Sequence, residues 1–76
     1  MITRIQCRMA RSALRWTLQE LADRSEVGRA TLTRFEAGQG TPNASTLKVV
    51  RQAFEAAGVE FIPGGVRLRE PAEAAQ

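Results

Sequence analysis

The chain of 76 residues has room for one domain, and its 43% hydrophobic and 25% charged content is ordinary for a globular protein. Ten arginines and one lysine oppose eight acidic residues, giving a net charge of +3 that favours polyanionic partners. A GC-rich genome would also raise the arginine content, so charge alone does not decide the function. One cysteine and no histidine exclude a disulfide framework, a zinc finger and histidine-based catalysis within one chain.

The first predicted helix spans residues 2–15, because apolar residues recur there at helical spacing. They form one inward stripe: Ile2, Cys7, Ala10 and Leu14, with Met9 and Ala13 as candidates for a wider stripe. The arginines take the remaining surface. A lone thiol on such a stripe, here Cys7, is more often core filling than a nucleophile.

A second helix is predicted to begin at Thr17, where Thr17-Leu18-Gln19-Glu20 matches the S/T-x-x-E capping box. Trp16 before the cap and Leu21 after it have the spacing of a hydrophobic staple. The inward stripe then consists of Leu18, Leu21 and Ala22. It is interrupted at residues 24–26, so we expect the helix to end there.

A third helix is predicted from Gly28, with Leu32 and Phe35 facing inward. The residues that point outward are small, hydroxylated or cationic: Ala30, Thr33, Arg34 and Ala37, with Arg29 at the shoulder. Such a face suits the major groove of DNA, where arginine can fork onto guanine and short side chains allow close approach. An ordinary solvated helix face is the alternative.

The rest of the chain reads as a loop, a fourth helix and a hairpin. Gly38 and Pro42 end the third helix, and Asn43 caps a helix from Ala44 to about Ala57. From residue 59 the apolar period changes to 2, and residues 59–62 and 66–69 flank Pro63-Gly64-Gly65, which predicts a short β-hairpin. A two-stranded hairpin is marginal alone and exposes strand edges. We therefore predict a dimer sealed by this segment, through Val59, Phe61, Ile62, Val66 and Leu68.

These elements resemble the phage-repressor-like helix-turn-helix proteins, often called the XRE or Cro/repressor family. The resemblance covers about residues 8–59. It rests on the residues that stand where the family places its L-A, V, I/L, hydrophobic and E-x-G positions: Leu21-Ala22, Val27, Leu32, Phe35 and Glu36-Ala37-Gly38. The chain departs from the pattern at Leu18, Glu26 and Gly28, where the family usually has Gln, Gly and Ser or Thr.

The resemblance implies a mainly α, four-helix lambda-repressor-like domain, to which this chain adds a hairpin. We expect a DNA-binding domain at residues 1–58, a dimerisation hairpin at 59–70 and a flexible tail at 71–76. Base contacts would come from the third helix: Arg29, Ala30, Thr33 and Arg34. Phosphate contacts would come from three segments: Arg8 and Arg15; Thr17, Leu18 and Gln19; and Gln39, Gly40 and Thr41. A structural ion pair is expected between Arg11 and Glu36.

The implied function is a transcriptional regulator, expected to be a repressor that binds a near-palindromic double-stranded operator as a homodimer. An antitoxin or accessory module that binds a toxin or a polymerase is the alternative, and the two are not exclusive. An enzyme ranks last, since no nucleophile stands with a base and no metal or cofactor is expected. With no apolar run near the ~20 residues that span a bilayer and no signal peptide, we expect a cytoplasmic, nucleoid-associated protein without membrane partners.

Overall fold

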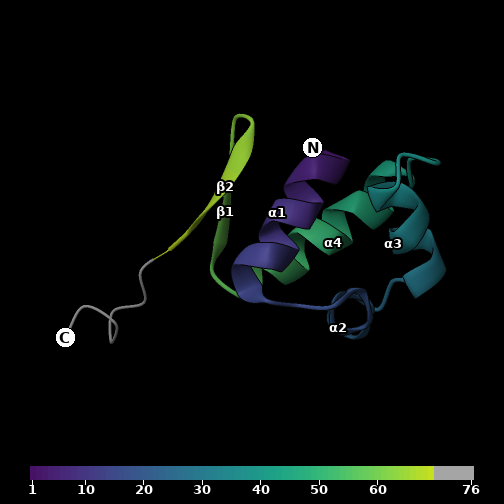
Figure 1. The fold of residues 1–76 in the computed structure, drawn as a ribbon, viewed down its shortest axis with the longest axis horizontal. Coiled ribbons are helices and arrows are strands. Elements are labelled where there is room, and N and C mark those ends of the chain that lie inside the picture. Colours follow the sequence, from purple (N-terminus) through teal and green to yellow (C-terminus); the bar gives the residue numbers. More distant parts are fainter. Residues whose placement is uncertain (70–76) are drawn as a thin grey trace.

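Four helices and a C-terminal hairpin make up the fold of the computed structural model, which describes residues 1–69. The elements in order are α1 (Arg4–Leu14), α2 (Leu18–Ser25), α3 (Arg29–Glu36), α4 (Ala44–Ala56), β1 (Val59–Ile62) and β2 (Gly65–Leu68). The hairpin and α3 lie at opposite ends of the molecule, with α1 and α4 between them (Figure 1). The predicted mainly α fold with a short hairpin is confirmed. The predicted tail, residues 71–76, lies outside the described residues.

Helix α1 begins two residues later than expected, because Thr3 caps it. The Thr3 hydroxyl accepts a hydrogen bond from the Gln6 amide, and the Gln6 side chain accepts one from the Thr3 amide, both at 3.0 Å. Ile2 precedes the helix but is still buried. The wider inward stripe was wrong: Met9 is 40% exposed and Ala13 is also exposed, because both lie on the far side of the helix from Cys7.

Helix α2 has the predicted capping box. The Thr17 hydroxyl accepts from the Glu20 amide at 3.0 Å, and the Glu20 carboxylate accepts from the Thr17 amide at 2.9 Å. The helix ends at Glu26, which adopts the left-handed conformation at φ 60°. The family that this chain resembles usually has glycine at this position. Glu26 therefore holds a side chain in a backbone conformation that favours glycine.

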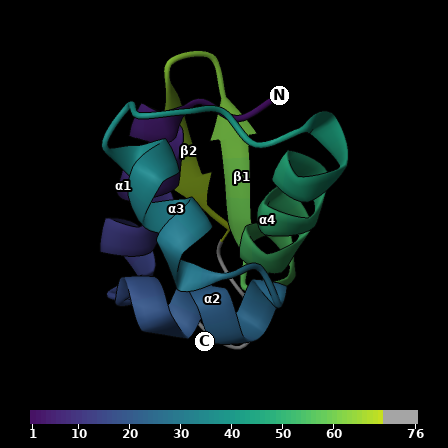
Figure 2. The same ribbon diagram turned by 90° about the vertical axis from the view of Figure 1, so that its right-hand side faces the viewer.

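Helix α3 is capped by Gly28 and ends in a Schellman motif. The amides of Gly38 and Gln39 donate to the carbonyls of Phe35 and Arg34 at 3.1 and 2.8 Å. Gly38 takes the left-handed conformation at φ 77° that this motif requires. The loop therefore leaves α3 in a fixed direction and crosses to α4 (Figure 2).

The hairpin docks on α1 and α4 and shares their core. Strand β2 starts at Gly65, one residue before the predicted strand, because Pro63-Gly64 alone makes the turn and Gly65 already pairs with Ile62. The Gln6 side chain donates to the carbonyls of Ile62 and Gly65 at 2.8 and 3.1 Å. This buried amide fastens the tip of the hairpin to α1.

The core lies where the helices and the inner face of the hairpin meet. Its aromatic centre joins distant segments: the Trp16 ring stacks on Phe54 with 5.6 Å between centroids, and Phe61 meets Phe54 edge-on at 6.0 Å. The apolar residues buried there come from every helix and from β1: Ile2, Cys7, Ala10, Trp16, Leu21, Ala22, Leu32, Phe35, Leu47, Val50, Phe54 and Val59. Helix α3 is therefore held from behind while its outer side stays open.

Candidate nucleic-acid interface

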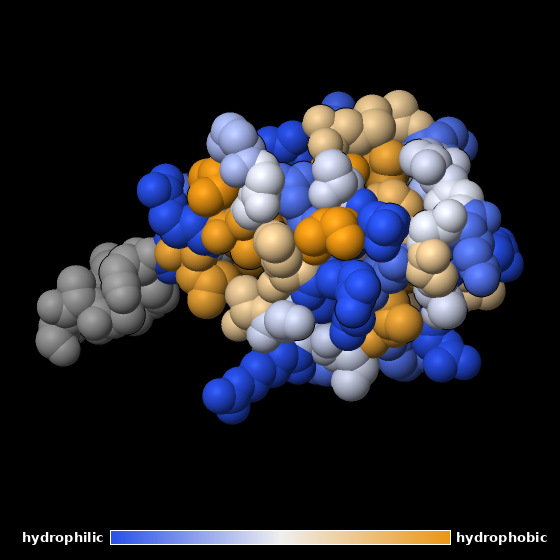
Figure 3. All heavy atoms as spheres, turned by 45° about the horizontal axis from the view of Figure 1, so that its top comes forward, coloured by the Kyte–Doolittle hydropathy of each residue, from blue (hydrophilic) through white to orange (hydrophobic). Residues whose placement is uncertain are grey.

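The outer face of α3 carries the four residues that were predicted to touch bases. Leu32 and Phe35 point into the core, with 0% and 5% exposure. All four candidate base-reading side chains are exposed on the other side: Arg29, Ala30, Thr33 and Arg34. Figure 3 shows hydrophilic residues mixed with weakly polar and weakly apolar ones at this end of the molecule. The helix thus presents a small, cationic surface to an incoming ligand.

The Thr33 hydroxyl has a defined orientation on this face. It donates to the Arg29 carbonyl of its own helix at 2.9 Å. Its oxygen remains able to accept a hydrogen bond, and its methyl group is available for an apolar contact. Thr33 is thereby suited to meet either a base amino group or a thymine methyl.

Arg11 of α1 holds the C-terminal end of α3 in place through an ion pair with Glu36. Its Nε and Nη2 donate to the two carboxylate oxygens of Glu36 at 2.8 and 2.7 Å, while its Nη1 donates to the Trp16 carbonyl at 3.0 Å. The predicted ion pair is therefore present as a two-point pair. Its hydrogen bond to Glu36 raises the pKa of Arg11, although partial burial acts in the opposite direction. One guanidinium ties α1, the start of α2 and the end of α3 together.

Cys7 belongs to the same buried cluster. Its thiol is fully buried and donates to a Glu36 carboxylate oxygen at 3.3 Å. Burial, and then the negative charge of Glu36, raises the pKa of Cys7 far above the ordinary value of 9.0. The thiol therefore stays protonated and acts as a hydrogen-bond donor, which agrees with core filling rather than nucleophilic chemistry.

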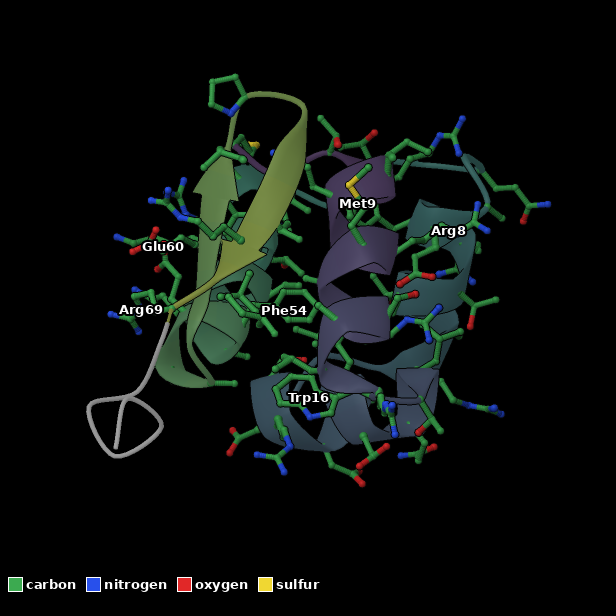
Figure 4. All side chains as sticks on the ribbon, turned by 60° about the vertical axis from the view of Figure 1, so that its left-hand side comes forward. Arg8, Met9, Trp16, Phe54, Glu60 and Arg69 are labelled. Carbon is green, nitrogen blue, oxygen red and sulfur yellow. The ribbon has the colours of Figure 1, made fainter. Side chains whose placement is uncertain are left out.

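The arginines of the first segment share one flank of α1. Their spacings of four, three and four residues place them on the side that faces α3: Arg4, Arg8, Arg11 and Arg15. Arg11 forms an ion pair with Glu36, whereas Arg8 and Arg15 are exposed and form no ion pair within residues 1–69. Figure 4 shows Arg8 on the α3 side of α1. We call Arg4, Arg8 and Arg15 the α1 arginine flank.

Arg4 was not among the predicted site residues. It lies over the loop that follows α3, so close that a methyl group added at Gly38 would come within 3.3 Å of its Nε. The predicted phosphate residues of that loop, Gln39, Gly40 and Thr41, are all exposed but contain no cation. Arg4 brings the missing positive charge. Its four-residue spacing from Arg8 was the sequence signal for this.

At the start of α2, the backbone amides are more available for a phosphate contact than the side chains are. The Thr17 oxygen is used in the capping box, and the Gln19 amide donates to Asp23 at 2.9 Å. The Leu18 side chain packs against the core. Leu18 can therefore reach a phosphate only through its backbone amide, and the first amides of a helix have no partner inside it.

The predicted dimerisation residues divide into two groups. Val59 is 1% exposed, and Phe61 and Val66 are half-buried, so these three side chains pack against the core of their own chain. Docking on α1 and α4 uses the inner face of the hairpin, and a contact of Phe61 and Val66 with a second copy stays a prediction. Ile62 and Leu68 remain exposed, at 38% and 49%.

Across residues 1–69, no group of three or more metal-ligating side chains is placed to hold an ion. In the same part of the chain, no helix has the length and apolar character needed to cross a bilayer.

Comparison with known proteins agrees with this geometry. A helix-turn-helix family model matches residues 8–59, which run from the second turn of α1 to the first residue of β1. A search of curated proteins found no match. The matched segment is more than half of the chain and contains α2, the turn at Glu26 and the exposed face of α3. The chain belongs to the XRE-type, phage-repressor-like helix-turn-helix family of DNA-binding regulators.

Proposed function

We propose that this regulator is a transcriptional repressor that binds a near-palindromic operator as a homodimer, with one α3 in each of two major grooves. The observation that carries the proposal is the outer face of α3. Arg29 and Arg34 are exposed there and form no ion pair within the described residues, beside two short side chains, Ala30 and Thr33. Short side chains let a helix enter the groove, and free guanidinium groups can fork onto guanine.

Each residue of this face has a proposed role. Arg34, and Arg29 one turn and a half before it, would donate to the O6 and N7 acceptors of guanine. Ala30 and the Thr33 methyl would contact thymine methyl groups. Because the Thr33 hydroxyl hydrogen is directed at the Arg29 carbonyl, its oxygen would accept from a base amino group.

Phosphate groups on either side of the groove would meet three sets of donors. The α1 arginine flank supplies three of the cations, and the loop at residues 39–41 supplies backbone amides beside Arg4. The first amides of α2, at Leu18 and Gln19, supply a third set. These contacts would orient α3 in the groove without reading the sequence.

A homodimer accounts for the sequence specificity that one short helix cannot reach alone. Helix α3 has only eight residues, so a single protomer reads few base pairs. Two protomers related by a two-fold axis would read half-sites centred about 34 Å apart, one turn of DNA. The operator would then show inverted symmetry.

The alternative function, an antitoxin or accessory module with a protein partner, has one observation in its favour. Ile5 and Met9 are 42% and 40% exposed on α1, on a side that the proposed DNA contacts do not use. An antitoxin of this fold could repress its own operon, so this alternative adds a partner and leaves the DNA contacts unchanged. A partner that copurifies with the chain and is lost on Met9→Glu would support it.

Selection of bound duplexes from a random pool tests the proposal. The wild-type chain should enrich an inverted repeat whose half-site centres lie about one helical turn apart. A variant with Arg29→Ala and Arg34→Ala should lose the enriched motif but keep weak binding at low salt, because its phosphate contacts remain. No binding of any duplex at low salt would refute DNA recognition, whereas enrichment of a motif without symmetry would refute only the dimer.

A further inference from the structure

We propose that the outer face of α1 binds an acidic, amphipathic helix of a different protein, and that this helix competes with DNA for Arg8. The proposal rests on the proposed function, because the competition requires that Arg8 contacts phosphate. It adds the kind of partner, its place on the chain and its effect on the operator complex. The apolar part of this face is called the α1 strip; its residues, Ile5, Met9 and Ala13, stand four positions apart on one side of the helix.

The α1 strip lies beside a shallow hollow that is open to solvent. Its two large side chains, Ile5 and Met9, are 42% and 40% exposed although both are apolar. The hollow has a volume of about 580 Å³ and is lined by α1 alone, through Ile5, Arg8, Met9, Ser12 and Ala13. The first four of these stand at positions i, i+3, i+4 and i+7, which together form the hole that receives one side chain of a packing helix. The shape of this face therefore suits a helical partner.

One border of the α1 strip is cationic, and no nearby acidic residue balances it. The first acidic residue of the chain is Glu20, so α1 contains none, and β2, which packs on α1, contains none either. Arg8 of the α1 arginine flank lines the hollow and forms no ion pair within residues 1–69. Figure 4 shows Arg8 and Met9 side by side on α1, with Arg8 nearer α3. The face thus combines apolar contact area with unpaired positive charge.

The chemistry of the partner follows from these two features. An apolar strip beside unpaired guanidinium groups is complementary to a helix that has an apolar stripe with carboxylates along one border. A carboxylate can accept two parallel hydrogen bonds from one arginine. From Ile5 to Ala13 the axis of α1 rises by about 12 Å, so a partner helix of about three turns would cover the strip.

Two other occupants fit this face less well. A membrane surface would need a larger apolar area, because α1 exposes only two large apolar side chains and neither is aromatic. A second copy of this chain would bring its own α1 to the contact, with the same arginines and no carboxylate. An acidic helix of a different protein matches both the apolar strip and the arginines.

Arg8 links this face to the operator. In the proposed DNA complex Arg8 donates to a phosphate, whereas in the partner complex it would donate to a carboxylate. One guanidinium group cannot serve both ligands at once, and an acidic helix beside it would also repel the DNA backbone. The partner would therefore release the operator, while the DNA contacts in its absence stay those described above.

Selection from a displayed library of random helical peptides, with the full chain as target and no DNA present, tests the proposal. Enriched peptides should carry apolar residues at spacings of three and four, with glutamate or aspartate beside them. A fluorescent copy of the strongest binder should lose about tenfold or more in affinity on Met9→Gln, which removes the apolar side chain without changing the charge. Arg8→Ala should cause a similar loss. Val49→Gln is the matched control, because Val49 is 41% exposed on α4 and lies outside this face.

The same peptide should displace a bound duplex from the wild-type chain, and a much higher concentration should be needed with Met9→Gln. Far-UV circular dichroism reports whether each variant is folded. A consensus without acidic residues would overturn the proposal, as would a peptide that binds folded Met9→Gln as tightly as the wild type. Peptide and duplex bound together at saturation would overturn the competition.

Two further measurements test the other occupants. Binding to phosphatidylglycerol vesicles that is lost on Met9→Gln would assign the strip to a membrane surface, and a wild-type dimer that this variant dissociates would assign it to a second copy; either would overturn the proposal. The peptide is bound without DNA, so the two proposals can fail separately. A chain that binds the peptide through Met9 but binds no duplex would refute DNA recognition, and with it the competition. A chain that binds a duplex but enriches no peptide dependent on Met9 would refute only the docking surface.

Discussion

The arginines at the two ends of the molecule have different partners. At the hairpin end, Arg67 pairs with Glu60, Arg51 pairs with Glu55, and Arg69 donates to a backbone carbonyl. At the helix-turn-helix end, the exposed arginines form no ion pair within residues 1–69: Arg4, Arg8, Arg15, Arg24, Arg29 and Arg34. At the hairpin end two of the three arginines are in ion pairs, whereas at the other end the exposed guanidinium groups are available to an anionic ligand.

The acidic residues explain part of this difference. At the α3 end, Glu36 is held by Arg11 in the interior, and Glu20 accepts the Thr17 amide in its capping box. These carboxylates are directed to internal donors, so they do not compete for the exposed guanidinium groups. The exposed guanidinium groups near α3 therefore carry positive charge that no carboxylate within residues 1–69 pairs with. A basic surface of this kind steers a duplex toward the recognition helix.

The largest expected effect concerns the one arginine at the α3 end that is paired. Arg11→Ala should lower the free energy of unfolding by about 3 to 5 kcal/mol, because it leaves the Glu36 carboxylate buried without a counter-charge. Urea denaturation followed by Trp16 fluorescence measures this. Arg67→Ala removes an exposed pair at the hairpin end and should cost less than about 1 kcal/mol. Similar losses in the two variants would show that the Arg11 pair is not structural.

The second prediction compares free and paired arginines in DNA binding. Arg34→Ala should weaken binding to a selected operator by about 1 to 3 kcal/mol and relax the preference at one base position. Arg67→Ala should leave the affinity unchanged, because that side chain is engaged with Glu60 at the far end. Fluorescence anisotropy with matched and single-substituted duplexes gives both values. If Arg34→Ala weakens all duplexes equally, Arg34 is a phosphate contact and not a base reader.

Local signals in the sequence were enough to predict most of the fold. The capping box at Thr17, the glycine after α3 and the change of period at Val59 are short-range patterns, and each lies where expected. The Thr3 cap was missed although Thr3 and Gln6 also match a capping box. The apolar residue Ile2 before it fits the inward stripe of the helix, so the apolar pattern alone predicts a start that is two residues too early.

Long-range packing explains what the sequence could not show. The hairpin was expected to turn its apolar face to a second copy, but α1 and α4 cover that face. Nothing in residues 59–69 reveals that the Gln6 amide, 56 positions before Ile62, would bind the hairpin tip. The approach of Arg4 to Gly38 likewise depends on how α1 crosses the end of α3.

The third prediction uses alkaline pH to probe the buried cluster behind α3. The Cys7 thiol has a raised pKa in the folded chain, so above pH 9 the unfolded chain loses this proton first. The free energy of unfolding should then fall with rising pH, by about 1.4 kcal/mol per unit. The chain has no tyrosine or histidine to add a titration there. Cys7→Ala should abolish this part of the slope, and an identical slope in both proteins would contradict the assignment.

The smallest predicted effect separates the two ends by salt dependence. Arg8→Ala should weaken binding to every duplex alike and reduce the slope of log affinity against log salt by about one unit, because one fewer counterion is released from phosphate. Arg69→Ala, at the hairpin end, is the control and should leave the slope unchanged. Titrations at several salt concentrations, with specific and random duplexes, give the slopes. An unchanged slope for Arg8→Ala would place the α1 arginine flank outside the interface, and DNA would then have to approach α3 from the side of α4.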